Sequence, residues 1–551
     1  MPSMTLEQAF ALAQEHQAAG RLAEAESLCR QILAVQPNSP QVIQTLGIIA
    51  CTQARNAEGI GWFEQAARLD PTVPAYHANL GLALATEGRM DEALHAYQRA
   101  LELGPGPALL YNNYGNALRG VGRMDEALAV YRHAALIASS SLDMSNLLWF
   151  LHFHPASTPK LILDEHVRWD HRFAQRLLDP AMRHSNDRSP DRRLRIGYVS
   201  ADLREHPVGR FIAPVLAHHD RSVFEIFCYS DTPRHDALTK RLVGYASTWR
   251  DIAPLTEEDL AAVIRQDSID ILVDLALHSG GSRLLTFARK PAPVQVSWLG
   301  YPATTGLSAM DYRLTDPYLD PPGEGDEYYT EQSVRLPNSF WCYEPPVEQT
   351  SVNPLPATSR GSITFGSFNN TCKVNDVVLE LWARAMQAVP GSRLLLLMPE
   401  GAARSRVMQK LTGSGIEQSR IDFVPRQKRQ QYLELYQQVD VALDTFPYTG
   451  HTTTQDSLWM GVPVVSLRGQ TAVSRGSLSV LSNVGLPWLV AESPENFVSL
   501  AVQICSDLPR LAELRSSLRP RMMQSTLMDA PRFTRDLEAA FRQMWRKWCA
   551  R

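Results

Sequence analysis

The sequence has few cysteines and no long apolar run, and each absence excludes a class of protein. The seven cysteines among 551 residues are scattered, odd in number and never spaced as CxxC, which argues against a disulfide framework or a zinc knuckle. No stretch approaches the roughly 18 apolar residues of a membrane span, and the N-terminal segment MPSMTLEQAFALAQEHQ mixes charged with apolar residues. We therefore expect reduced thiols, a cytoplasmic location and no membrane partner.

The sequence also lacks an excess of positive charge. Lys and Arg number 54 against 58 Asp and Glu, a formal net charge of −4, whereas a protein that follows nucleic-acid phosphates normally carries a cationic surface. We expect no nucleic-acid partner. The chain is longer than the roughly 250–300 residues that one hydrophobic core supports, so about three to four structural units are predicted.

A repeat of 34 residues fills the N-terminal quarter. The string GRMDEAL occurs at 88–94 and again at 122–128. Other residues recur with the same period: Pro37, Pro71 and Pro105; Gly47, Gly81 and Gly115; Ala93 and Ala127; Tyr97 and Tyr131. This period and these residue types resemble the tetratricopeptide repeat.

Each repeat is predicted to be two antiparallel helices. Small Gly and Ala would lie where the helices touch, a Tyr or Phe63 would fill the gap, and Pro would break the chain before the next unit. About four repeats cover residues 6–139, so we predict an α-solenoid over 1–139 and a helical linker over 140–190. Solenoids of this kind bind an extended peptide or a helix, which indicates a macromolecular partner.

Beyond residue 190 short apolar runs alternate with helical stretches, which is typical of parallel sheets with crossover helices. The runs are LRIGYVS, FEIFCYS, DILVDL, VQVSWLG, ITFGSF, RLLLLM, RIDFV, VDVALD and PVVSL. A Pro-rich stretch at 345–356 separates two Rossmann-like α/β domains, predicted over 191–350 and 351–551. The second domain ends in an amphipathic helix that we expect to pack on the α/β half. The fold class is therefore α + α/β, a solenoid followed by two α/β domains.

The strongest polar cluster after a strand is TGHTTTQDSLWMGVPVV at 449–465. Ligands of open α/β sheets lie at the carboxyl ends of the strands. Here His451, Thr452 and Thr453 open a helix whose free N–H groups and dipole would hold the diphosphate of a nucleotide sugar. Helix capping by Thr453 and Asp456 is the plain alternative. The chain has no DxD pair for a divalent cation, so no metal is expected.

Three further clusters follow strands, and each has a structural alternative. Lys373 in SFNNTCK would neutralise charge on a departing nucleotide, unless it is only a solvated surface lysine. His206 in REHPVGRF would accept a proton or a hydrogen bond near the acceptor hydroxyl, unless it only caps a helix. His278 in DLALHSGGSR precedes a Gly pair that permits close approach of a ligand, or else forms a structural turn.

The motifs HPVGRF, WLGYPATTG, FNNTCK and GHTTTQD, in this order behind the repeats, resemble the O-GlcNAc transferase family, glycosyltransferase family 41. The resemblance covers nearly the whole chain. It implies a two-domain GT-B enzyme, inverting and metal-independent and with no cofactor, that transfers GlcNAc from UDP-GlcNAc to Ser or Thr hydroxyls of proteins.

Residue roles follow from the same resemblance. His206, His278 and Lys373 match catalytic positions, with His206 near the sugar and the acceptor and Lys373 on the diphosphate. The UDP-sugar site takes in the positions around them: Asn370, Lys373, Arg429, His451, Thr452, Thr453 and Asp456. Asp456 is expected near the ribose. FVPRQKRQQY departs from the animal enzymes, which carry Lys and His where Arg429 and Tyr432 stand here.

Two other functions stay open at this point. A protein glucosyltransferase that uses UDP-glucose would need the same UDP cradle. A tetratricopeptide adaptor whose α/β half only binds a UDP-sugar would share the architecture without catalysis. Partners expected in the main interpretation are a protein or peptide acceptor along the repeats and the UDP-sugar, and such repeats can also form a homodimer.

Overall fold

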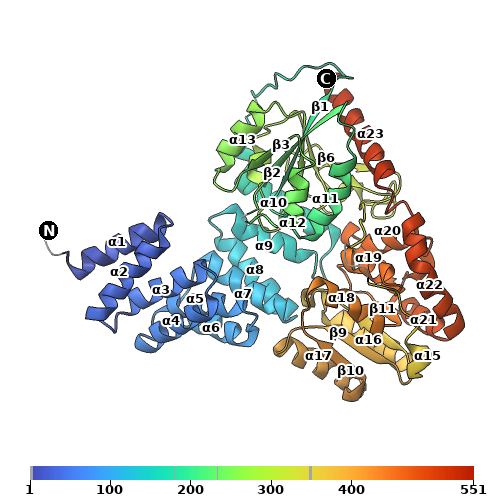
Figure 1. Cartoon of the computed structure of the whole chain (residues 1–551), viewed down its shortest axis with the longest axis horizontal. Helices are drawn as coiled ribbons and strands as arrows, with labels where there is room; N and C mark the ends of the chain where they lie inside the picture. The colour runs from blue at the N-terminus through green and yellow to red at the C-terminus, as the bar shows by residue number, and fades with distance from the viewer. Residues whose placement is uncertain (1–3, 180, 233, 347–349) are drawn as a thin grey trace. The chain divides into compact units, whose positions relative to one another are not determined.

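The computed structural model describes residues 4–179, 181–232, 234–346 and 350–551 (Figure 1). The chain divides into two compact units. One comprises residues 1–139 together with 399–406, and the other comprises 140–398 and 407–551. Residues 347–349 of the Pro-rich stretch lie outside the described part. Among the residues described, no helix has both the length and the apolar character needed to cross a bilayer.

The first unit contains four antiparallel helix pairs over the residues where the sequence predicts the repeats. The pairs are α1 (Leu6–Ala18) with α2 (Leu22–Val35), α3 (Pro40–Thr52) with α4 (Asn56–Leu69), α5 (Pro74–Thr86) with α6 (Met90–Glu102), and α7 (Ala108–Gly120) with α8 (Met124–Ile137). Pro37, Pro71 and Pro105 lie between successive pairs, as predicted.

The repeated glycines allow the two helices of a pair to touch. A Cβ atom added at Gly81 would lie 2.7 Å from the ring of Tyr97, and Gly47 and Gly115 are as close to Phe63 and Tyr131. Atoms at such a distance overlap, so a larger residue would push the helices apart. The predicted contact of a small residue with a bulky aromatic is confirmed in three repeats.

The glycine of GRMDEAL has a different task, because it turns the chain between the helices of a pair. Gly88 and Gly122 have φ angles of 79° and 82°, a left-handed conformation that glycine adopts without steric cost. Gly20 is the equivalent residue of the first repeat, at 73°. In the second repeat the position is taken by Ala54, which adopts 61° in spite of its Cβ atom.

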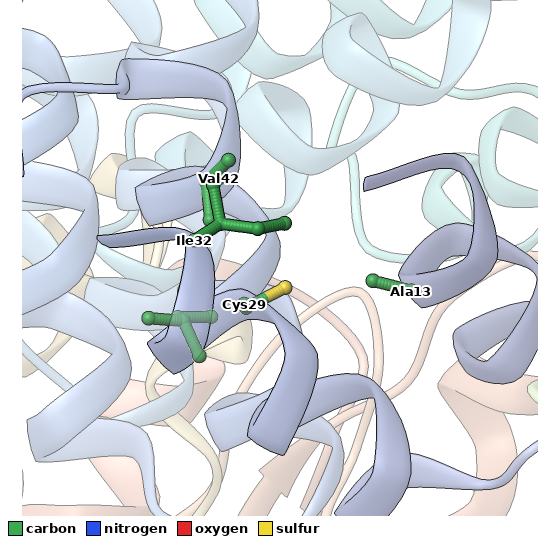
Figure 2. Close-up of a cluster of buried hydrophobic side chains, with 5 residues drawn as sticks. Ala13, Cys29, Ile32 and Val42 are labelled. Carbon is green, nitrogen blue, oxygen red and sulfur yellow. The ribbon is translucent and has the colours of Figure 1, made fainter. Parts of the chain in front are cut away.

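The N-terminal pairs share a small apolar core, shown in Figure 2. Ala13, Cys29, Ile32, Val42 and Leu46 are buried there, and Phe10, Leu33 and Trp62 pack around them. Burial raises the pKa of the Cys29 thiol to about 11, so this cysteine acts as an apolar core residue. No disulfide joins the cysteines in the part of the chain that the structure describes.

The second unit opens with helices α9 (Ser141–Leu151) and α10 (Pro159–Trp169), followed by a seven-stranded parallel sheet. Its strands are β1 (Leu194–Ser200), β2 (Phe224–Ser230), β3 (Thr248–Asp251), β4 (Ile271–Asp274), β5 (Val294–Ser297), β6 (Tyr312–Thr315) and β7 (Gln332–Arg335). The order is β3-β2-β1-β4-β5-β6-β7. Successive strands are added on one side of β1 up to β3 and on its other side from β4 onward. Such sheets bind ligands at this point, between β1 and β4.

The second sheet has six parallel strands in the order β10-β9-β8-β11-β12-β13. They are β8 (Thr364–Ser367), β9 (Arg393–Leu397), β10 (Ile421–Val424), β11 (Val441–Leu443), β12 (Val464–Leu467) and β13 (Val490–Ala491). Its reversal lies between β8 and β11. The predicted fold class, a solenoid followed by two Rossmann-like domains, is thus confirmed.

Four strands were not anticipated from the sequence. They are β3, β6, β7 and β13, and each has four residues or fewer. β3 (TWRD) and β7 (QSVR) carry charged or polar side chains because they form the edges of the first sheet. Short edge strands do not produce the apolar run by which the buried strands were found.

The helices of the α/β domains cover the two sheets. They are α11 (Pro207–His218), α12 (Ala237–Val243), α13 (Glu257–Gln266), α14 (Leu284–Ala288), α15 (Ala357–Arg360), α16 (Asp376–Ala388), α17 (Ala402–Gly413), α18 (Arg429–Leu435), α19 (Thr452–Trp459), α20 (Gly476–Asn483), α21 (Pro494–Cys505), α22 (Leu508–Gln524) and α23 (Ala530–Cys549). The last helix packs on the first α/β domain beside α11, as Figure 1 shows. There Glu538 accepts hydrogen bonds from the backbone of Asp220 and from His219, so the predicted packing of the terminal helix is confirmed.

Candidate functional site

A cavity of about 600 Å³ lies between the carboxyl ends of the two sheets. Its lining comes from the loops after β1, β4, β5 and β7 of the first sheet and after β8 and β11 of the second. Aromatic residues from α9 and from the turn after it complete the lining. The sequence motifs meet here, since the lining includes His206, Gly281, Gly300, Asn370, Lys373, His451, Thr452 and Thr453.

His206 forms the cap of α11 and lines the cavity with 37% of its side chain exposed. The glycine of the HPVGRF motif explains how the helix start fits. A Cβ atom at Gly209 would collide with the carbonyl oxygen of Arg204, so only glycine lets the first turn of α11 pack on the preceding loop. The capping interpretation is confirmed, and the functional role of His206 stays a prediction.

Asp202 is the carboxylate partner of His206 and was not anticipated from the sequence. Its Oδ2 lies 3.4 Å from His206 Nδ1, and the backbone N–H of Val208 lies at the same distance from that nitrogen. The two contacts compete: Val208 donates only to an unprotonated Nδ1, whereas the carboxylate accepts only from a protonated one. Burial lowers the pKa of His206 and so favours the neutral ring, while Asp202 raises the pKa. When the proton of the neutral ring is on Nδ1 and directed at Asp202, Nε2 is the unprotonated nitrogen.

Lys373 ends the short turn Thr371–Lys373 after β8 and reaches into the cavity from the second domain. Its Nζ donates to the carbonyl oxygen of Thr449 at 2.7 Å and lies 4.2 Å from the ring centre of Tyr448. Burial lowers the pKa of this lysine to about 8, although the nearby Asp444 raises it. The ammonium is therefore held in place before any ligand arrives, and it is not a solvated surface lysine.

His451 precedes α19 in a strained conformation. Its φ angle is 39°, which is uncommon for a residue other than glycine. Nε2 lies 3.0 Å from the carbonyl oxygen of Val473 and donates to it, since a carbonyl can only accept. Burial, and then Lys373, lower the pKa of His451 to about 3. The ring is consequently neutral, and Nδ1 is the nitrogen left as an acceptor.

Thr452 and Thr453 form the first turn of α19 and line the cavity. The Thr453 hydroxyl donates to the carbonyl of Gly450 at 2.6 Å and contacts Asn369 Oδ1 at 2.7 Å, so it is tied to the protein. The first N–H groups of a helix have no intrahelical partner, and the dipole is positive there. Asn370 caps the turn that carries Lys373 and is exposed to the cavity. The second domain thus presents a cation and a helix N-terminus at one point.

Arg429 and Asp456 do not line this cavity. They pair with each other through two contacts of 2.7 Å, and the hydroxyl of Tyr343 donates to Asp456 at 3.2 Å. Asp456 is buried, so the guanidinium neutralises a carboxylate that would otherwise repel an anion at the start of α19. The structure brings these two predicted residues together behind the site.

His278 lies in the core and not on the cavity surface. It is 3% exposed, with Nε2 2.7 Å from the carbonyl of Thr305 and Nδ1 3.1 Å from the Ser145 hydroxyl. The ring also meets Trp169 edge to face at 4.7 Å. The residues after it, from Ser279 to Gly281, do line the cavity. In this structure His278 supports the loop, as in the structural alternative stated for it.

Aromatic side chains make up a part of the cavity wall that sequence reasoning missed. Tyr448 stacks on Phe153 at 4.7 Å and contacts His451 at 4.8 Å, while Trp341 contacts His451 from another side at 4.9 Å. Trp149, on α9, also lines the cavity. Tyr448 stands three residues before His451 and could have been suspected from that position, but nothing in the sequence links it to Phe153, which follows α9.

The chain is similar to several known proteins. It is 41% identical over 412 residues to the probable UDP-N-acetylglucosamine–peptide N-acetylglucosaminyltransferase SPINDLY of Solanum lycopersicum, covering 73% of this chain and 44% of that protein. The protein of the same name in Oryza sativa subsp. japonica is 42% identical over 392 residues, covering 70% of this chain and 42% of that one. This chain therefore spans less than half of the length of these curated relatives.

Solved structures and family models extend the comparison. A mutant of the Thermobaculum terrenum O-GlcNAc transferase is similar over 99% of this chain and 98% of its own, with 36% identity and a TM-score of 0.81. A tetratricopeptide repeat model matches residues 45–106 and 78–141. The model of glycosyl transferase family 41 matches residues 160–344 and 353–537, which include every motif that lines the cavity. The chain belongs to glycosyl transferase family 41.

Proposed function

We propose that this protein transfers N-acetylglucosamine from UDP-N-acetylglucosamine to Ser or Thr hydroxyls of protein substrates, with inversion and without a metal ion. Support comes from the family and from the names of its relatives, several of which are called UDP-N-acetylglucosamine–peptide N-acetylglucosaminyltransferases. The full-length similarity to an O-GlcNAc transferase structure supports the same activity.

One observation carries the proposal, namely the opposite character of the two cavity walls. The second domain supplies the Lys373 ammonium beside the N-terminus of α19. The first domain supplies His206 with its partner Asp202. A diphosphate leaving group needs fixed positive charge, and an attacking hydroxyl needs a proton acceptor, so each wall suits one half of a sugar transfer.

The reaction in this site is a direct displacement at the anomeric carbon. A lone pair of the acceptor oxygen forms the new bond to that carbon while its bond to the diphosphate oxygen breaks, and the electron pair departs with UDP. Lys373 and the helix start stabilise the added negative charge, in the role that a metal ion has in other transferases. The hydroxyl proton passes to Nε2 of His206, because an Nδ1–H that donates to Asp202 leaves Nε2 as the unprotonated nitrogen.

The repeats supply the other half of the proposal. Stacked helix pairs form an extended surface that suits a polypeptide, so we propose that the acceptor protein binds along the repeats. The homodimer and the cytoplasmic location stay predictions from the sequence.

The test is sugar transfer from radiolabelled UDP-sugars to the proteins of a host lysate. We expect label on protein from UDP-N-acetylglucosamine, and its loss in the Lys373→Ala variant. Label from UDP-glucose instead would change the assigned donor. Tight UDP binding without transfer from any donor, also with peptides that carry Ser and Thr, would contradict the enzymatic function.

A further inference from the structure

A second cavity, of about 690 Å³, lies apart from the motifs described above. It is formed by the loops after β12 and β13, by the Glu324–Tyr328 segment after β6 and by the start of α10. Its charged lining consists of Lys160, Glu324, Arg468, Arg475 and Glu492. Both sheets again contribute the carboxyl ends of their strands, which is where α/β sheets bind ligands.

Arg475 is the unusual member of this lining. Only 6% of its side chain is exposed, yet its nearest acidic oxygens are Asp320 Oδ1 at 3.7 Å and Glu324 Oε2 at 3.9 Å. Both distances exceed a hydrogen bond. Nε is buried and has no hydrogen-bond partner within the described parts of the chain. A buried guanidinium nitrogen without an acceptor is rare, and an anionic ligand would supply one.

Another buried arginine of the same domain shows what a satisfied guanidinium looks like. Arg515 is 1% exposed and donates to the backbone carbonyls of Asn353, Tyr436 and Val439, and to the side chain of Asn353. Its donors are used within the fold. Arg475 instead lines a cavity, and its Nε has no hydrogen-bond partner among the described residues, so the two buried arginines differ.

Arg468 lies on the same cavity and shares an acidic neighbour with Arg475. Glu324 Oε2 is 3.3 Å from Arg468 and 3.9 Å from Arg475, so one carboxylate oxygen stands between two guanidinium groups. Glu324 is 59% exposed and Glu492, the other acid near Arg468, is 68% exposed. Such loosely held carboxylates can swing into solvent and leave their place to another anion.

The start of α10 adds to the positive character. Thr158 caps this helix of eleven residues, and Thr158, Pro159 and Lys160 line the cavity. The Lys160 ammonium is paired with Asp164 at 2.7 Å, so the contribution here comes from the positive end of the helix. A helix start and two arginines thus converge on a cavity whose own acidic residues, Glu324 and Glu492, are largely exposed.

We propose that this cavity is a second binding site, for a phosphate or carboxylate group held by Arg475 and Arg468. The anion takes the place of the Glu324 carboxylate and accepts hydrogen bonds from both guanidinium groups. The bound group is either a small free oxyanion or the acidic side chain of a bound polypeptide. Both present negatively charged oxygens that accept hydrogen bonds from arginine.

The site is connected to the first cavity by one short turn. Arg475 ends the turn Ala472–Arg475, whose Val473 carbonyl accepts hydrogen bonds from His451 Nε2 and from the Thr449 hydroxyl, each at 3.0 Å. Thr449 in turn holds Lys373 through its own carbonyl. An anion that draws Arg475 toward it therefore displaces the turn that holds His451 and Thr449. An effect of this displacement on the binding of the sugar donor rests on the proposed function.

Direct binding of inorganic phosphate tests the site itself. The full chain carrying Lys373→Ala, which weakens phosphate binding in the first cavity, is titrated by calorimetry. We expect saturable binding that is at least about tenfold weaker when Arg475→Gln is added, and unchanged when Arg384→Gln is added. Arg384 is a matched control because it pairs with an exposed carboxylate on the surface of the same domain, at 3.2 Å.

A second variant, Glu324→Gln, keeps the test informative if the Arg475 variant fails to fold. It removes the competing carboxylate, so phosphate affinity is expected to rise several-fold. The acidic source is tested with a glutamate hexapeptide against its glutamine counterpart. If neither phosphate nor the acidic peptide binds in an Arg475-dependent way, or if Glu324→Gln weakens binding, the site is disproved.

The connection to the first cavity is measured separately, as the affinity for UDP with and without saturating phosphate in the Glu324→Gln protein. A change of a few-fold that disappears with Arg475→Gln is expected. Phosphate binding without any UDP binding would contradict the proposed function and leave the anion site intact, so the two failures are distinguishable.

Discussion

The two walls of the first cavity are built on opposite principles. On the second domain, Lys373 and His451 are each held by a backbone carbonyl, and burial lowers the pKa of both, to about 8 and about 3. On the first domain, His206 is more than a third exposed and faces a carboxylate. At pH 7 these pKa values leave Lys373 mostly charged and His451 neutral, whereas a carboxylate partner lets a histidine gain and lose a proton. One wall is thus suited to constant charge and the other to proton exchange.

The largest effect is expected on the proton-exchanging wall. His206→Ala should lower turnover about 10²–10⁴-fold, the usual contribution of a general base, while the affinity for UDP stays within a few-fold. His235→Ala is the matched control, since His235 has similar exposure, lies in the same domain and pairs with Asp251 at 3.0 Å outside the cavity. Steady-state kinetics and UDP calorimetry check both. A large loss of UDP affinity would contradict the division of the walls.

On the constant-charge wall, Lys373→Ala should lower turnover about 10²–10³-fold, by analogy with other fixed groups that stabilise developing charge. Lys410→Ala serves as the control, because that ammonium pairs with Asp376 at 2.7 Å on the surface. Near-full turnover of the Lys373 variant would show that the helix start alone carries the leaving group.

Asp202→Asn sharpens the comparison by removing the charge and keeping the shape. Turnover should fall about tenfold, since the asparagine still accepts from Nδ1 but stabilises the charged imidazolium less. Asp202 raises the pKa of His206, so the acidic limb of the pH profile should move to lower pH. A fall in turnover with an unmoved limb would indicate a purely structural role for Asp202.

The smallest effect concerns pH. With a pKa of about 8, Lys373 in the free enzyme is mostly charged at pH 7 and mostly neutral at pH 9, so UDP affinity should fall by up to about tenfold over this range. The sign follows from the need for a cation at the diphosphate. Calorimetry at both pH values measures it, with Lys373→Arg as the control, because an arginine remains charged and should remove the pH dependence.

Much of the fold could be predicted because it depends on local periodicity. The 34-residue period fixed the helix pairs, and the Gly and aromatic positions met as expected at Gly81 and Tyr97. Buried strands such as β1 and β9 showed themselves as apolar runs, whereas the edge strands β3 and β7 did not. Edge strands face solvent, so their sequence carries no comparable signal.

The site was predictable only in part, as two pairs of residues illustrate. Lys373 and His451 follow neighbouring strands, and parallel strands bring their carboxyl ends to one edge, so their meeting was foreseeable. His206 and His278 follow the neighbouring strands β1 and β4 in the same way, yet the first lines the cavity and the second is buried between Ser145 and Thr305. A strand end specifies where a loop starts but not which side chain turns inward.

The sequence by itself determined the repeats, the two parallel sheets and the family, because these follow from period, alternation and short motifs. Only the tertiary structure decided that Asp202 partners His206, that Phe153 covers Tyr448, and that Arg429 neutralises Asp456. It also left Nε of Arg475 buried beside a cavity with no acceptor among the described residues. These contacts join residues that are far apart in the sequence. They depend on how the whole chain packs, so no local sequence pattern reveals them.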